Sequence, residues 1–193
     1  MIRLAGLALV AASALGSCTH AGEVPVGSPP GQVTQNRPSE ILADALAKAD
    51  LAASTNDTKA LARALATIGA LGARPLDQTA QAQLAQWQSQ SPVTVPPLRG
   101  RTLGPGFRKG TLTAGADWRI EQTFLSGQKA SVALSTPDRA RLRLEVIDNA
   151  AATICRNVAM APACEWIPIY TQRHVIQLTN VDRQDTRFYL VIE

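Results

Sequence analysis

Charged and apolar side chains alternate strictly along Arg141-Leu142-Arg143-Leu144-Glu145-Val146. Successive side chains of a β-strand point to opposite faces, so this period predicts a strand with one buried and one solvated face. The same alternation recurs in 118–124, 130–134, 174–178 and 188–192. Turn signals separate these runs, and such an arrangement predicts an antiparallel β-sandwich of roughly seven or eight strands.

Residues 39–90 follow a helical period instead, with a start at Pro38-Ser39-Glu40. We expect Ser39 to be the N-cap, with Glu40 near the positive end of the helix dipole. Breaks at 54–57 and near Pro75 divide the segment into three helices, which form a hairpin or a three-helix unit. Alanine-rich helix faces make shallow contacts, so we favour a spacer or packing role for the helical segment. The alternative is that the segment forms a helix-in-groove or oligomerisation surface.

A Pro- and Gly-rich linker, 91–106, is expected to join the helices to the sandwich, 107–193. The sequence shows neither a helical nor a strand period from Leu98 to Gly110. The predicted fold class is therefore α+β, with a short N-terminal helical segment followed by the sandwich.

The start of the chain is typical of an export signal. Arg3 supplies the positive charge, and residues 4–15 form an apolar run too short for a bilayer, which needs about 20 residues. Leu15-Gly16-Ser17-Cys18 then resembles the lipobox of bacterial lipoprotein signal peptides. The resemblance implies a diacylglyceryl thioether on Cys18, removal of residues 1–17 and acylation of the new amino group. An ordinary secretory signal cleaved after Ala21 is the alternative.

Several acyl chains together would anchor the protein stably in a membrane. Thr19 replaces the Asp that marks inner-membrane retention, so resemblance to lipoproteins of two-membraned bacteria points to the outer membrane. Residues 18–38 are rich in Gly, Pro, Ser, Asn and Gln and are expected to be a lipidated tether without a fold of its own.

The other two cysteines, Cys155 and Cys164, leave an even count after lipidation of Cys18. An oxidising compartment favours pairing, so we predict a Cys155–Cys164 disulfide that contributes roughly 2–3 kcal/mol. A redox or metal pair is the alternative, but the spacing is not C-x-x-C and no histidine accompanies it.

The second half also resembles the bacterial pre-peptidase C-terminal domain, a small jelly-roll-like β-sandwich. The stretches that carry the resemblance are 124–132, 142–148, 164–168, 174–180 and 188–190. The chain departs from the pattern at His174, where Tyr is usual, and at Asn149-Ala150, where Gly is common. The resemblance implies binding or attachment without catalysis. Some members bind calcium, but we interpret the acidic turn residues here as solvated; they are Asp138, Asp148, Asp182 and Asp185.

Catalytic patterns are missing from the sequence: it has no G-x-S-x-G, P-loop or G-x-G-x-x-G, and its histidines are His20 and His174. A Ser-His-Asp hydrolase would need His174 as its base, but a buried strand histidine is the simpler interpretation. The candidate ligand-facing residues are Tyr170, Trp166 and His174. We expect no enzyme activity, cofactor or metal.

The net charge of +4 is scattered along the chain, which is not the clustered pattern of a nucleic-acid binder. We therefore expect an envelope lipoprotein held by its lipid, whose sandwich binds a protein or a cell-envelope polymer at the periplasmic or outer surface. The alternative is a structural or assembly subunit of an envelope complex that acts through its helical segment.

Overall fold

The computed structural model describes residues 37–91 and 104–193. The predicted signal peptide, the predicted lipidation site Cys18, and most of the tether and linker lie outside the described residues. The helices are α1 (Pro38–Ser54), α2 (Thr58–Ala70) and α3 (Gln78–Gln90). The strands are β1 (Arg74–Pro75), β2 (Gly106–Leu112), β3 (Asp117–Phe124), β4 (Ala130–Ser135), β5 (Leu142–Ile147), β6 (Thr153–Ala159), β7 (Ala163–Trp166), β8 (Gln172–Asn180) and β9 (Thr186–Ile192).

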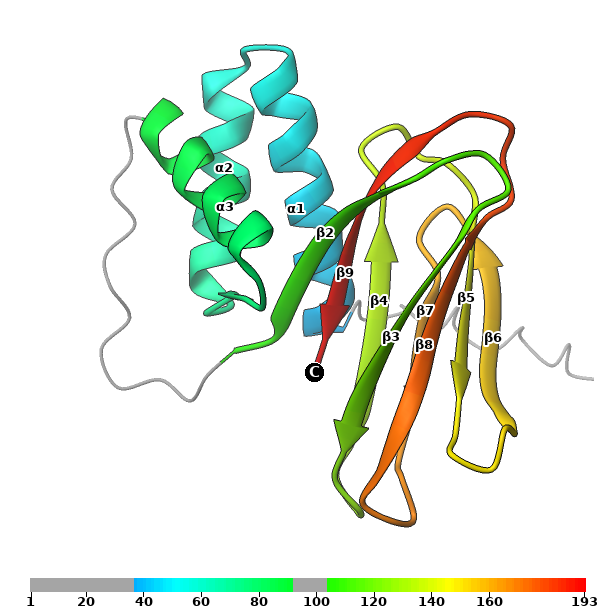
Figure 1. The fold of residues 1–193 in the computed structure, drawn as a ribbon. Coiled ribbons are helices and arrows are strands. Elements are labelled where there is room, and N and C mark those ends of the chain that lie inside the picture. Colours follow the sequence, from blue (N-terminus) through cyan, green and yellow to red (C-terminus); the bar gives the residue numbers. More distant parts are fainter. Residues whose placement is uncertain (1–36, 92–103) are drawn as a thin grey trace, which may run out of the picture. The chain divides into compact units, whose positions relative to one another are not determined.

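The strands form two sheets that pack face to face, so the predicted α+β fold with a β-sandwich is confirmed (Figure 1). Sheet A has the order β1-β2-β9-β4-β7 and sheet B the order β3-β8-β5-β6. Every pairing is antiparallel except the short parallel pair of β1 with β2. The apolar members of the alternating runs meet between the sheets, as Leu142, Leu144 and Val146 of β5 do.

Sheet A is buried on both faces. Phe188, Leu190 and Ile192 of β9 point into the sandwich, whereas Tyr189 and Val191 point to the opposite face and pack with the helices. Figure 1 shows the three helices beside this face of sheet A. A strand covered on both sides needs apolar residues at nearly every position, which explains the unbroken run at the end of the chain.

The helical segment is thus a third layer of the fold. Leu42 and Leu46 of α1 are fully buried between α2 and the sheet. Trp87 of α3 is fully buried as well, with its ring centroid 5.8 Å from that of Tyr189. A side chain of this size contributes roughly 3–5 kcal/mol in a core, so the helices are bound firmly to sheet A.

The start of α1 differs from the sequence prediction, which was wrong about the N-cap. The helix begins at Pro38, and Ser39 lies inside its first turn. Arg37 is the N-cap residue, but its side chain makes no capping hydrogen bond. Proline suits the first helical position because its missing N–H would be unpaired there anyway. Ser39 is free to face the sheet, where its Oγ lies 2.6 Å from Oγ of Ser131 on β4.

The predicted disulfide is present and joins the two sheets. Cys155 lies on β6 of sheet B and Cys164 on β7 of sheet A, with 6.0 Å between their Cα atoms. Asn157 Nδ2 adds a hydrogen bond of 3.0 Å to the carbonyl of Ala163 across the same edge. This edge of the sandwich is therefore closed covalently.

A buried carboxylate connects α1 to β9. The Asp50 side chain is 5% exposed, and its Oδ1 lies 3.0 Å from Nη1 of Arg187. Burial raises the pKa of the neighbouring Tyr189 phenol far above its usual range, and the Asp50 charge adds to the rise. The phenol therefore stays protonated beside the carboxylate.

We predict that Asp50→Asn lowers the free energy of unfolding by about 1–3 kcal/mol, because it removes a charge-assisted pair from a buried position. Urea denaturation followed by tryptophan fluorescence measures the change. The control is Asp44→Asn, whose carboxylate is 55% exposed beside Lys48 and is expected to matter by less than about 0.5 kcal/mol. Equal stability of the two variants would contradict this role of Asp50.

Candidate functional site: an apolar tip on two braced loops

Two loops at one end of the sandwich are fixed to each other. The first joins β3 to β4 through a turn at 125–128, in which Gly127 adopts the left-handed φ of +72° that favours glycine. The second joins β7 to β8 through 167–171. The Gly127 N–H donates to the Pro168 carbonyl at 2.9 Å, and Ser126 donates from N to Thr171 Oγ1 at 3.0 Å and from Oγ to the Ile169 carbonyl at 2.5 Å.

The braced loops expose four large apolar side chains. Leu125 is 51% exposed, Ile167 63%, Ile169 79% and Tyr170 71%. We call these four residues the apolar tip. Single exposed apolar residues are ordinary, but a group of them on two joined loops is a candidate interaction surface.

An aromatic cluster lies beneath the loops and supports them. The Phe124 ring is 4.8 Å from the Trp166 ring and 5.4 Å from that of His174, and the Trp166 and His174 rings are 5.5 Å apart. Phe124 and Trp166 stand directly before the two loops, at the ends of β3 and β7. Because these rings are held by packing, the loops begin from fixed points and the tip is preorganised.

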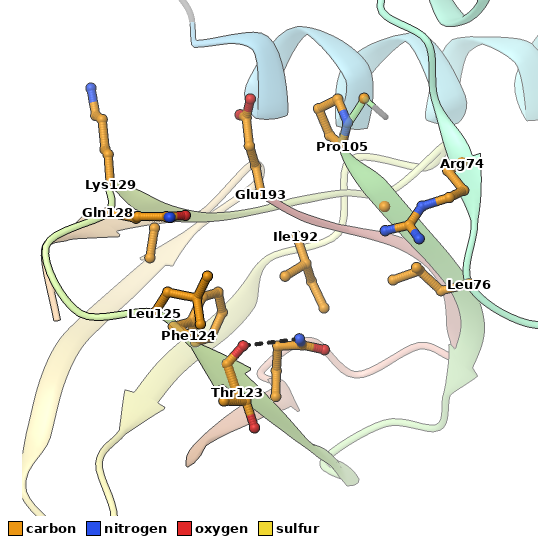
Figure 2. Close-up of a pocket in the computed structure, with 14 residues that line it drawn as sticks. Arg74, Leu76, Pro105, Thr123, Phe124, Leu125, Gln128, Lys129, Ile192 and Glu193 are labelled. Carbon is orange, nitrogen blue, oxygen red and sulfur yellow. Dashed lines mark hydrogen bonds between the residues drawn. The ribbon is translucent and has the colours of Figure 1, made fainter. Parts of the chain in front are cut away.

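A pocket of about 310 Å³ adjoins the tip. It lies where the end of β3 separates from the start of β2, and Leu125 belongs both to its wall and to the tip. Figure 2 shows Phe124 and Leu125 on one side of it, Arg74 and Leu76 on the other, and Ile192 between them. The loop end therefore combines a protruding apolar surface with an adjoining hollow.

The structure separates the three residues that the sequence suggested as ligand-facing. Tyr170 lies in the apolar tip, whereas Trp166 is half-buried and His174 is only 1% exposed. The latter two belong to the supporting cluster. The sequence analysis did not identify Leu125, Ile167 and Ile169 as ligand-facing. Each is an apolar residue between the end of a strand and a turn signal, and that position could have indicated exposure.

His174 does not form a catalytic arrangement within the part of the chain that the structure describes. Its Nδ1 lies 3.3 Å from the Gln172 carbonyl, and its ring packs against Phe124 and Trp166. Each of the four acidic turn residues accepts a hydrogen bond from the protein; they are Asp138, Asp148, Asp182 and Asp185. Among the residues in 37–91 and 104–193, no group of three potential metal ligands comes together. In those same ranges, no helix has the length and apolar character to cross a bilayer.

Comparison with known sequences finds no matching protein family and no matching curated protein. Solved structures give weak similarities. The pre-peptidase C-terminal domain of the Bacillus anthracis collagenase covers 45% of this chain and 87% of its own, with 9% identity and a TM-score of 0.41. The Yersinia pseudotuberculosis-derived mitogen covers 46% of this chain and 84% of its own, with 16% identity and a TM-score of 0.40.

The periplasmic inhibitor of g-type lysozyme from Aeromonas hydrophila covers 63% of this chain and 94% of its own, with 13% identity and a TM-score of 0.40. Likeness at this level carries no argument about function. A closer relation to the pre-peptidase C-terminal domain stays a prediction.

We predict that Thr171→Val loosens the two loops, because it removes the acceptor of the Ser126 N–H while keeping the side-chain shape. Hydrogen exchange of the Ser126 amide, followed by NMR, should become faster by about tenfold, which corresponds to one ordinary hydrogen bond. Thr113→Val, on an exposed turn between β2 and β3, is the matched control and should leave that rate unchanged. An unchanged rate in Thr171→Val would mean that packing alone holds the loops.

Proposed function

We propose that this protein is a non-catalytic binding module of the bacterial cell envelope, held there by lipid on Cys18, and that it binds a protein partner through the apolar tip. The observation that carries the proposal is the exposure of four large apolar side chains on loops that three hydrogen bonds join. Exposed apolar side chains on rigid loops do not stabilise the fold, because they stay in contact with water. A partner that covers them would explain why they are there.

The chemistry of the tip favours a protein over a polysaccharide as the partner. Three of its four side chains are aliphatic, and aliphatic groups gain most from entering an apolar pocket. Tyr170 adds a hydroxyl at the margin, and tyrosine is enriched in protein interfaces. Preorganisation lowers the entropy lost on binding, because the loops are already fixed before the partner arrives.

We predict that the double variant Ile167→Ser, Ile169→Ser loses at least tenfold of its partner retention, since two anchor side chains no longer enter the interface. The measurement is affinity capture from envelope extract with the full chain as bait, followed by quantitative mass spectrometry. Both residues are exposed, so the unfolding free energy should change by less than about 0.5 kcal/mol.

The matched control is Ile154→Ser, Val158→Ser on β6, where the side chains are 41% and 43% exposed. It removes the same kind of surface away from the tip and should keep its partners. A protein retained equally by both double variants would contradict binding through the tip.

The assembly alternative has an observation of its own. A groove of about 600 Å³ runs between α1 and α2. Four alanines line it together with four charged residues and with Ile41 and Leu51, which are 37% and 49% exposed. A helix of another subunit fits such a groove by its small-residue lining. Loss of partners on Leu51→Ser, with the tip intact, would favour this second function.

The anchor has a separate test. We predict that the mature chain begins at Cys18 and carries two ester-linked acyl chains on a glyceryl thioether and one amide-linked acyl chain on its amino group. Intact mass spectrometry of protein extracted from membranes measures this. A chain that begins after Ala21 without added lipid would exclude the anchor and leave the binding proposal for the sandwich to stand on the capture experiment.

A further inference from the structure

The pocket beside the tip is lined by two cations, Arg74 and Lys129, and by one acidic residue, Glu193. Arg74 lines it, and its guanidinium makes no hydrogen bond or ion pair with any residue that the structure describes. Lys129, the other cation of the lining, is engaged by Glu165 at 2.9 Å. In Figure 2 the Arg74 side chain reaches toward Ile192, whereas the Lys129 and Glu193 side chains point away from it.

Backbone hydrogen bonds hold Arg74 in this position. The N–H groups of Arg74 and Leu76 donate to the carbonyls of Pro105 and Phe107 at 3.0 and 2.9 Å, which places β1 beside β2. Gly106 makes the arrangement possible, because a Cβ there would lie 2.7 Å from Cδ2 of Leu76. Leu76 can therefore form one wall of the pocket, with Arg74 at its rim.

The remaining lining sets the chemistry of a ligand. Phe124, Leu125 and Ile192 give the hollow apolar walls opposite Leu76, and about 310 Å³ is enough for one branched or aromatic side chain. An unpaired guanidinium at the rim binds a carboxylate best, since its planar fork of donors matches two oxygens. The pocket thus suits an apolar group that carries a carboxylate within a few bonds.

We infer that the pocket formed by Arg74, Leu76, Phe124, Leu125 and Ile192 is a specificity pocket that takes an apolar side chain and a neighbouring carboxylate of the bound protein partner. The inference rests on the proposed function, because Leu125 is shared by the pocket and the tip and places both in one continuous surface. The tip supplies apolar contact area, and Arg74 selects a segment in which an acidic group stands beside a bulky apolar residue.

The test is an NMR titration of the isotope-labelled full chain carrying Cys18→Ser, with N-acetyl-leucine and N-acetyl-leucinamide as probes. The acid should shift the methyl signals of Ile192, Leu76 and Leu125 and bind at least about tenfold more tightly than the neutral amide. Arg74→Gln should remove this preference, and Arg74→Lys should keep part of it. A third probe, acetyl-Asp-Leu-amide, distinguishes an acidic side chain from a free chain terminus as the source of the carboxylate.

Equal binding of acid and amide, equal binding to the chain and to its Arg74→Gln variant, or no shift of the three methyl signals would overturn the inference. Lys59→Gln, which changes an exposed residue of α2, is the control for the loss of one positive charge and should bind the acid like the parent chain. The titration needs no partner, so it can succeed where the capture experiment fails. If the tip variant keeps its partners while the acid preference holds, the proposed function fails and the pocket remains.

Discussion

Sheet A is buried on both of its faces, by the sandwich core on one side and by the helices on the other. One set of β9 side chains fills the sandwich, and the other set, with Tyr189 at its centre, carries the helical layer. The fold needs the helical layer as well as the sandwich core, because removal of the helices would expose Phe107, Tyr189 and Val191 to water. The Asp50–Arg187 pair and the Ser39–Ser131 contact fix the helices at one place on this sheet.

This arrangement determines which surface is left for function. Helices cover the outer face of sheet A, and the disulfide closes one edge of the sandwich. Among the surfaces that stay open, the loop end carries the apolar tip, and there the aromatic cluster gives the loops rigid starting points. In the proposed complex, burial of the apolar-tip side chains would contribute on the order of 1–2 kcal/mol each. A rigid scaffold that carries exposed loops is a common design for recognition.

The sequence predicted the strands whose alternation is strict, which became β3, β4, β5, β8 and β9. It did not predict β2, because Gly110 looks like a loop residue; the structure shows that a Cβ there would lie 2.5 Å from the Phe188 ring. Strand β6 was missed because it lies at the edge of sheet B. Its apolar residues Ile154 and Val158 face solvent, so they do not show the alternation of a strand with one buried face. The docking of the helices on sheet A could not be read from periodicity, which reports that a face is buried but not what buries it. For the site, Tyr170 was accessible to sequence reasoning, but the joining of two distant loops into one tip was not.

Site-specific photo-crosslinking in cells tests binding through the apolar tip, with a benzophenone amino acid placed at position 169 or at position 154. We expect a defined crosslinked protein from position 169, at the tip, and none from position 154 on the β6 edge. A crosslink from position 154 alone, or identical products from both positions, would contradict the assignment of binding to the apolar tip.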